Sequence, residues 1–183
     1  MLQFVSSNAN KARELQHVLQ MPLELCPQML PEIQTDDLTE LVTYKARTAF
    51  AALGKPLLVE DTSLYFEGWG QLPGPLIKWF LRNLSLTDLF RAVEAGGNLR
   101  ARAVCMIGWT HNGEEVRHFV GEIRGYVCQP RGQEGFGWDA IFQPNGSSRT
   151  FAEMSQEEKL CYSMRTLAAS QLKDFLAPEV TQS

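Results

Sequence analysis

The sequence predicts an α/β fold in which a mixed β-sheet is flanked by helices. The first twenty residues read as a strand, a polar loop and a helix. The middle of the chain holds two β-rich runs, residues 102–109 and 116–128, and Asn112-Gly113 between them is the best short-range hairpin signal. Because helices alternate with strands at both ends while the centre is a hairpin, we expect parallel and antiparallel pairing in one sheet.

The N-terminal third supplies the first strands and helices. Residues 2–6 read as a short strand, and apolar residues then recur at helical spacing. A second amphipathic pattern, opened by a capping signal, predicts a helix over residues 38–53. The apolar run 57–59 suits a short strand buried on both faces, and we expect this strand to end at Glu60 and Asp61.

The remaining helices follow from their caps and spacing. Residues 76–84 and 86–95 are predicted to be helical, the second beginning at Ser85. The pattern Ser-x-x-Glu at residues 155–158 is a capping box, which predicts one final helix to about Phe175.

Composition narrows the class of protein. The 183 residues are 44% hydrophobic and 21% charged, which suits a single globular domain over residues 1–183. The net charge of −4 gives no overall attraction for nucleic acid or an acidic membrane, so any anionic ligand must be bound locally. No apolar run could span a bilayer and no signal peptide pattern is present, which predicts a soluble cytoplasmic protein.

The cysteines suggest no metal or redox chemistry. They are widely scattered and form no CxxC pair, so we interpret them mostly as small apolar core residues; they are Cys26, Cys105, Cys128 and Cys161.

The loop Ser6-Ser7-Asn8-Ala9-Asn10-Lys11 lies where the first strand leads into the first helix. A helix N-terminus offers unpaired N–H groups and partial positive charge, and Lys11 adds a full charge, so phosphate is the natural ligand. On pattern alone, a simple cap by Ser7 or Asn8 beside a solvated Lys11 is the better interpretation.

Two adjacent carboxylates, Glu60 and Asp61, follow the buried run 57–59. Because side chains alternate along a strand, at most one of them is expected to face a given cleft. Asp61 and Glu32 could together hold magnesium, which prefers oxygen ligands and substrate phosphates. A carboxylate beside that ion can take a proton from an attacking water, but a turn cap and a solvated acid are about equally plausible.

The run Gly135-Phe136-Gly137-Trp138-Asp139 places two aromatic rings in a glycine-bounded loop. Phe136 or Trp138 could stack on a flat ligand, although either ring could equally anchor the loop in the core. Three basic residues are further candidates for the site. Taken alone, each of Lys78, Lys159 and Arg165 is better explained as a solvated cation.

The order of these motifs resembles the inosine triphosphate pyrophosphatase family, especially its eukaryotic-type members, over nearly the whole chain. The matching segments are Phe4-Val5-Ser6-Ser7-Asn8-Ala9-Asn10-Lys11, Leu30-Pro31-Glu32-Ile33, Val59-Glu60-Asp61-Thr62-Ser63-Leu64, Leu72-Pro73-Gly74-Pro75-Leu76-Ile77-Lys78-Trp79-Phe80-Leu81, Phe136-Gly137-Trp138-Asp139, and Thr150-Phe151-Ala152-Glu153-Met154 with Glu158-Lys159.

The resemblance implies an elongated, two-lobed body with a central cleft, commonly a homodimer, that hydrolyses ITP, dITP and XTP to monophosphate and pyrophosphate. It implies Mg²⁺, with Mn²⁺ as a possible substitute, bound by Glu32 and Asp61, and Asp61 as the catalytic residue that activates water. The implied triphosphate contacts are Ser6, Ser7, Asn8, Lys11, Lys45, Lys78 and Lys159. The implied base and nucleoside contacts are Thr62, Phe136, Gly137, Trp138, Asp139, Met164 and Arg165.

Two positions depart from the family pattern. Ser7 replaces a glycine, so a positive φ or a very close phosphate would be less comfortable there. Met164 replaces the usual histidine before Arg165 and cannot form a strong hydrogen bond to the base, which puts rejection of GTP in doubt. A related triphosphatase with another modified-base preference and a catalytically silent nucleotide-binding module are the alternatives, while a purely structural domain is disfavoured.

Overall fold

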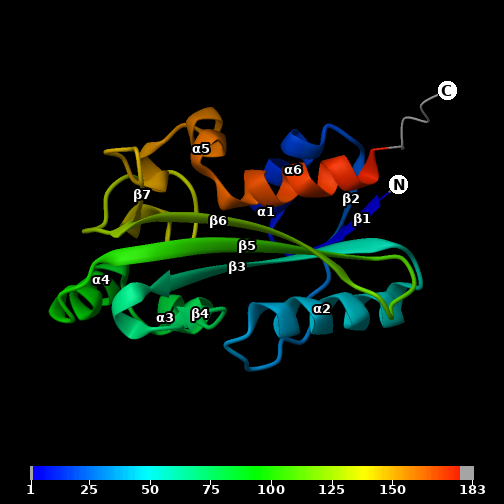
Figure 1. Ribbon diagram of the computed structural model, residues 1–183, viewed down its shortest axis with the longest axis horizontal. Coiled ribbons are helices and arrows are strands. Elements are labelled where there is room, and N and C mark those ends of the chain that lie inside the picture. The colour runs from blue at the N-terminus through cyan, green and yellow to red at the C-terminus, as the bar shows by residue number, and fades with distance from the viewer. Residues whose placement is uncertain (1, 178–183) are drawn as a thin grey trace.

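The computed structural model describes residues 2–177 and contains the expected mixed sheet (Figure 1). Six strands lie in the order β2-β1-β3-β5-β6-β7, and β4 pairs with β3 outside this path. The strands are β1 (Leu2–Val5), β2 (Leu23–Cys26), β3 (Leu57–Phe66), β4 (Pro73–Gly74), β5 (Arg100–Thr110), β6 (Arg117–Val127) and β7 (Phe142–Pro144). Strand β1 is parallel to β2 and β3, and the pairs from β3 to β7 are antiparallel, which confirms the α/β class.

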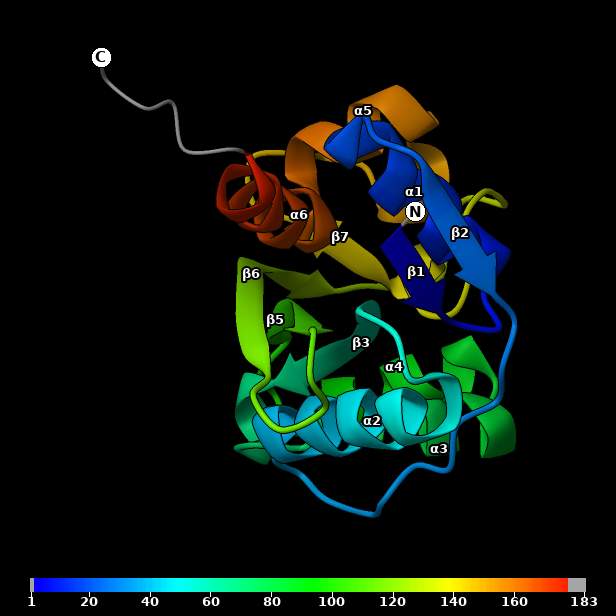
Figure 2. The same cartoon turned by 90° about the vertical axis from the view of Figure 1, so that its right-hand side faces the viewer.

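Helices cover both sides of this sheet. Figures 1 and 2 show α1, α5 and α6 on one side and α2, α3 and α4 on the other. The helices are α1 (Ala9–Leu19), α2 (Leu38–Leu53), α3 (Ile77–Asn83), α4 (Leu86–Ala95), α5 (Gln156–Tyr162) and α6 (Met164–Leu176), with short 3₁₀ turns η1 (Glu67–Trp69), η2 (Asp139–Ile141) and η3 (Phe151–Glu153). Within residues 2–177, no helix has the length and apolarity needed to cross a membrane.

Strand β3 is the long central strand, and the prediction that it ends at Glu60 and Asp61 is wrong. It continues to Phe66, because every residue from Leu57 to Phe66 pairs with a residue of β5. The two carboxylates therefore lie in the middle of a strand, where side chains from other elements compensate their charge.

Alternation along β3 separates two hydrophobic cores. Leu58 packs in the larger core with Leu15 of α1 and Leu172 of α6. Leu57 packs in the second core with Val42 of α2. Because neighbouring side chains of a strand point to opposite faces, Glu60 faces the side of α1 and α6 and Asp61 faces α2.

The single final helix that the capping box predicted is wrong, since Ser163 divides it into α5 and α6. Ser163 has φ −86° and ψ 128°, an extended conformation, and its side chain accepts a hydrogen bond from the backbone N–H of Arg165. A residue that ends one helix and caps the next redirects the chain. This break presents Met164 and Arg165, the first residues of α6, to the interior.

The cysteines also differ in part from expectation. Cys105 is fully buried, but Cys26 and Cys128 are only partly buried and Cys161 is exposed. Cys161 lies on a polar helix face, where the sequence pattern alone did not separate core from surface positions.

Gly121 of β6 allows α6 to approach the sheet closely. A Cβ atom built on Gly121 would lie 1.9 Å from the carbonyl oxygen of Met164 and 2.8 Å from the backbone nitrogen of Ala168. Both neighbours are backbone atoms, so they cannot move aside without displacing the start of the helix. The absence of a side chain at residue 121 thus sets the position of Met164 and Arg165.

We therefore expect Gly121→Ala to lower the free energy of unfolding by about 3 kcal/mol, because overpacking against backbone forces the helix off the sheet. Urea unfolding followed by circular dichroism measures this loss. Gly96→Ala is the control, since Gly96 has φ −78° and the nearest contact of an added Cβ is 3.3 Å. A loss no larger than that of the control would contradict the prediction.

Candidate active site

One cavity of about 580 Å³ gathers every site residue nominated from the sequence, and we call it the main cavity. Its wall is formed by Val5, Ser6, Ser7, Asn8, Lys11, Gln28, Met29, Leu30, Glu32, Lys45, Glu60, Asp61, Thr62, Pro75, Ile77, Lys78, Trp79, Leu81, Arg82, Phe136, Gly137, Trp138, Asp139, Lys159, Met164 and Arg165. Six basic side chains and four carboxylates belong to this wall although the whole chain carries a net charge of −4. The cavity is therefore a local concentration of positive charge in an acidic protein.

The loop before α1 combines a cap with a potential anion site. The side-chain oxygen of Asn8 accepts hydrogen bonds from the backbone N–H groups of Asn10 (3.0 Å) and Lys11 (3.3 Å). The backbone N–H of Asn8 in turn donates to the hydroxyl of Ser6 at 3.1 Å. Asn8 is thus the N-cap of α1, as the simpler interpretation held, and this cap also fixes the start of the helix in the cavity wall. The same interpretation took Lys11 as solvated, which is wrong, because its ammonium is paired with the buried Glu60 carboxylate.

Ser7 causes no backbone strain. Among the non-glycine residues 2–177, only Gln20 has a positive φ. The concern that Ser7 would need a left-handed conformation is therefore wrong, and its exposed side chain stands at the cavity wall. The loop reaches its shape through the Asn8 cap instead of through glycine.

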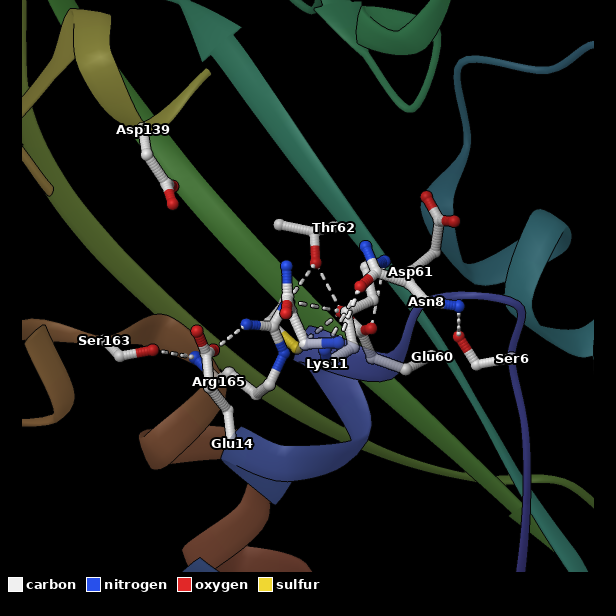
Figure 3. Close-up of polar contacts among 12 residues, drawn as sticks. Ser6, Asn8, Lys11, Glu14, Glu60, Asp61, Thr62, Asp139, Ser163 and Arg165 are labelled. Carbon is white, nitrogen blue, oxygen red and sulfur yellow. Dashed lines mark hydrogen bonds and ion pairs between the residues drawn. The ribbon is translucent and has the colours of Figure 1, made fainter. Parts of the chain in front are cut away.

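Glu60 is the most constrained acid of the site and was not among the nominated residues. Its carboxylate lies 3.0 Å from the Lys11 ammonium and 3.3 Å from the Arg165 guanidinium, and it accepts hydrogen bonds from the Thr62 hydroxyl and, at 3.2 Å, from the Cys105 thiol. Figure 3 shows Lys11, Thr62 and Arg165 converging on Glu60. Burial alone would raise the pKa of Glu60, but Arg165 and Lys11 hold it well below its ordinary value.

Arg165 joins this carboxylate to a second buried acid, Glu14 of α1. One terminal nitrogen of Arg165 forms an ion pair with Glu14, and the other donates to Glu60 and, at 3.1 Å, to the Thr62 hydroxyl. Burial would lower the pKa of Arg165, but Glu60 and Glu14 raise it above its ordinary value, so the side chain stays charged. Its Nε–H is buried and has no hydrogen-bond partner within residues 2–177.

Lys159 extends the network toward residues 135–139, which we call the aromatic loop. Its ammonium lies 3.3 Å from Glu14 and 2.7 Å from Asp139, and 4.8 Å from the ring centre of Phe136. Asp139 also accepts a hydrogen bond from the backbone N–H of Phe136 at 2.9 Å. Burial raises the pKa of Asp139, while Lys159 opposes this rise. The loop is therefore held by charge pairs at its base.

The two aromatic rings of the loop have different surroundings. Trp138 is 6% exposed, and its ring centre lies 5.4 Å from that of Phe142 and 6.2 Å from that of Phe151. Phe136 is only partly buried. Trp138 therefore anchors the loop in the core, and Phe136 is better placed to stack on a ligand. Gly137 between them has φ +65°, a conformation that glycine adopts without strain.

Lys45 brings the two proposed metal ligands together. Its ammonium lies 3.4 Å from a carboxylate oxygen of Glu32 and 2.9 Å from one of Asp61, and it donates to the backbone carbonyl of Glu60 at 3.1 Å. Lys78 forms a second ion pair with Glu32. Burial, and then the nearby charge of Arg82, lowers the pKa of Lys78.

This donor set fits magnesium. Glu32 and Asp61 accept from the same ammonium, so both can reach one cation position, and oxygen donors are what magnesium prefers. Within residues 2–177, no group of three or more histidine, cysteine or acidic side chains could hold a metal ion. Two carboxylates suffice for magnesium that is also bound by substrate phosphates.

The prediction that only one of Glu60 and Asp61 would face the cleft is wrong. They do point to opposite faces of β3, yet both line the main cavity, because the cavity extends past both faces of the strand. Glu14 was not singled out from the sequence, and Glu60 was considered beside Asp61 but given no role, because the cations that face them come from distant segments. The signal available was a charged residue interrupting the apolar pattern of a strand and of a helix.

Comparison with known proteins gives consistent matches over almost the full chain. The model of the Ham1 family matches residues 2–175. Inosine triphosphate pyrophosphatase of Schizosaccharomyces pombe is 41% identical over 179 residues, which cover 96% of this chain and 95% of that protein. The enzyme of the same name from Saccharomyces cerevisiae is 38% identical, with 94% of each chain covered.

Solved structures agree with these relatives. A HAM1 protein from Coxiella burnetii superposes with a TM-score of 0.83 at 29% identity, covering 96% of this chain and 98% of that one. A nucleoside-triphosphatase / dITP/XTP pyrophosphatase from Mycobacterium abscessus gives a TM-score of 0.71 at 26% identity, covering 97% and 100%.

We expect Glu60→Gln to lower the free energy of unfolding by about 3 kcal/mol at pH 7, because it leaves Lys11 and Arg165 without their shared charge. The pKa of Glu60 is depressed in the folded chain, so its contribution is complete above pH 4.5 and is lost as the pH falls below that value. The variant should therefore lose less stability than the native chain between pH 4.5 and pH 3.

Urea unfolding at a series of pH values measures both effects. Glu94→Gln, at an exposed position of α4, is the control and should follow the native curve. Parallel curves for Glu60→Gln and the native chain below pH 4.5 would show that Glu60 has no such role.

Proposed function

Because the chain belongs to the Ham1 family, we propose that it hydrolyses purine nucleoside triphosphates with deaminated bases. The substrates are ITP, dITP and XTP, and the products are the nucleoside monophosphate and pyrophosphate. Removing such nucleotides cleanses the nucleotide pool. The names of the relatives and the contents of the main cavity support this proposal independently of each other.

The observation that carries the proposal is the charge of the main cavity. Six basic side chains and the N-terminus of α1 surround a space of about 580 Å³ beside an aromatic loop. A helix N-terminus and several lysines suit a polyphosphate, and a half-buried aromatic ring suits a flat base. A purine nucleoside triphosphate combines both groups.

Cleavage of the bond between the α- and β-phosphates requires a placed water and neutralisation of the leaving pyrophosphate. Lys11, Lys45 and Lys78 would supply positive charge for this purpose. Lys159, also predicted as a triphosphate contact, lies beside Asp139 and Phe136. The Ser6, Ser7 and Asn8 loop adds backbone N–H groups. No covalent intermediate is needed, so the wall of the cavity acts by position and charge.

Glu32 and Asp61 would hold Mg²⁺, for which Mn²⁺ could substitute. When bound, this ion would add positive charge beside the phosphate oxygens. The Asp61 carboxylate would accept a proton from the attacking water, and Lys45, 2.9 Å away, orients that carboxylate. Lys45 also donates to the backbone carbonyl of Glu60 in the same strand, so the ammonium fixes both the Asp61 carboxylate and the backbone that carries it.

The residues that would select the purine base are Arg165 and Asp139, with Thr62 in support. The guanidinium of Arg165, a residue of the cavity wall, suits the acceptor oxygen at position 6 of hypoxanthine or xanthine, whereas adenine presents an amine donor there. Two facing donors leave both unpaired, which costs roughly 1–3 kcal/mol. Asp139 would contact the nucleoside from the other side of the loop, and Thr62 would hold Arg165 in place.

The family resemblance also predicts a homodimer and a cytoplasmic location. Sedimentation of the purified chain tests the oligomeric state, and fractionation of cells tests the location.

We predict that the native chain releases pyrophosphate from ITP in the presence of Mg²⁺ and that Asp61→Asn lowers kcat by about 10²–10⁴-fold, because an amide cannot take the proton. A coupled assay for pyrophosphate, with and without chelator, measures both. Asp174→Asn, at an exposed position of α6, should keep full activity. Release of orthophosphate from ITP would contradict the reaction, and tight ITP binding without turnover would indicate a silent binding module.

We predict that GTP is rejected weakly, because Met164 lines the main cavity without a strong hydrogen-bonding group. Met164→His should lower the ratio of kcat/KM for GTP to that for ITP by about tenfold, the value of one matched hydrogen bond. Met164→Leu is the control and should leave the ratio unchanged. A panel of purine triphosphates tests this, and equal ratios for all three proteins would refute it.

A further inference from the structure

Helix α3 presents two cations to the main cavity. Lys78 and Arg82 are four residues apart, so they lie on one face of the helix, and both belong to the cavity wall. Only Lys78 was nominated from the sequence. Like charges at this spacing repel, so the pair is unfavourable unless an anion lies near both.

The carboxylates at this end of the cavity do not compensate Arg82. Each of the other five basic side chains of the wall forms an ion pair with a carboxylate. Glu32 is already shared between Lys45 and Lys78. Within residues 2–177, Arg82 forms no ion pair with any acid. The uncompensated positive charge at this end of the cavity is therefore that of Arg82. The charge of Arg82 also contributes, after burial, to the lowered pKa of Lys78.

Trp79 holds the guanidinium at the edge of the cavity. The carbon at the centre of the Arg82 guanidinium lies 5.3 Å from the centre of the Trp79 ring, and the ammonium of Lys78 lies 5.6 Å from it. Trp79 also lines the cavity and is 42% exposed. Contact between a cation and an aromatic face limits the freedom of the side chain. Arg82 is thus positioned at the cavity and keeps donors for a ligand.

We propose that Arg82, together with Lys78, forms an outer anion subsite that binds the terminal phosphate of the triphosphate. This inference rests on the proposed function and adds to it a residue that recognises the length of the polyphosphate chain. A planar guanidinium donates two parallel hydrogen bonds to phosphate oxygens, which an ammonium cannot do. A phosphate between the two cations also removes their mutual repulsion.

Binding of inorganic tripolyphosphate and of IMP, measured by calorimetry with Mg²⁺, tests the subsite. Arg82→Ala should weaken tripolyphosphate binding about tenfold and leave IMP binding unchanged, because IMP carries no terminal phosphate. Arg82→Lys keeps the charge but loses the paired donors, so it should fall between the native chain and Arg82→Ala. Arg91→Ala is the matched control, since Arg91 is an exposed arginine of α4 beside Asp88.

Kinetics with ITP provide a second measurement. Arg82→Ala should raise KM about tenfold and change kcat by less than about twofold if the contact is made equally in the ground and transition states. Unchanged tripolyphosphate binding in Arg82→Ala would overturn the proposal, as would an equal loss of IMP binding or no tripolyphosphate binding by the native chain. Binding that depends on Arg82 in a chain that does not hydrolyse ITP would refute the proposed function and leave the subsite intact.

Discussion

The site depends on the compensation of one buried carboxylate, that of Glu60, in the middle of β3. An isolated charge in such a place would be very costly, so the fold must bring cations to it. Lys11 comes from α1 and Arg165 from α6, segments that are far apart in the sequence. Glu60 therefore determines where two helices of the same sheet face must begin. The start of α1 and Arg165 are aligned because they share this partner.

The same logic continues away from β3. Glu14 lies between Arg165 and Lys159, and Asp139 lies between Lys159 and the backbone of the aromatic loop. Acids and bases alternate along this chain of contacts, so each side chain is held by neighbours of opposite charge. Loss or displacement of one member of such a network is costly because it leaves a buried charge unpaired. Rigid placement of charge is what catalysis of phosphate transfer requires.

Elements with local signals were predicted well. The helix over residues 38–53, the two short helices after residue 76 and the central hairpin all agree with the structure, because caps, spacing and turn residues are local properties. The extent of β3 and the break at Ser163 were not predicted. Charged residues in the middle of a strand look like its end until their partners are known, and a serine inside a helical pattern looks like a surface residue.

The sequence by itself predicted the fold class and the candidate residues for the chemistry, since motifs such as the one around Asp61 depend on residue type and order. Only the tertiary structure decided how these residues meet. It placed Glu60 and Asp61 on opposite faces of one strand yet in one cavity, and it assigned Trp138 to the core. Among residues 2–177 it left Arg82 without an ion-paired carboxylate, because Glu32 is shared between Lys45 and Lys78. The physical reason is that burial and charge compensation are non-local, because they depend on segments that only folding brings together.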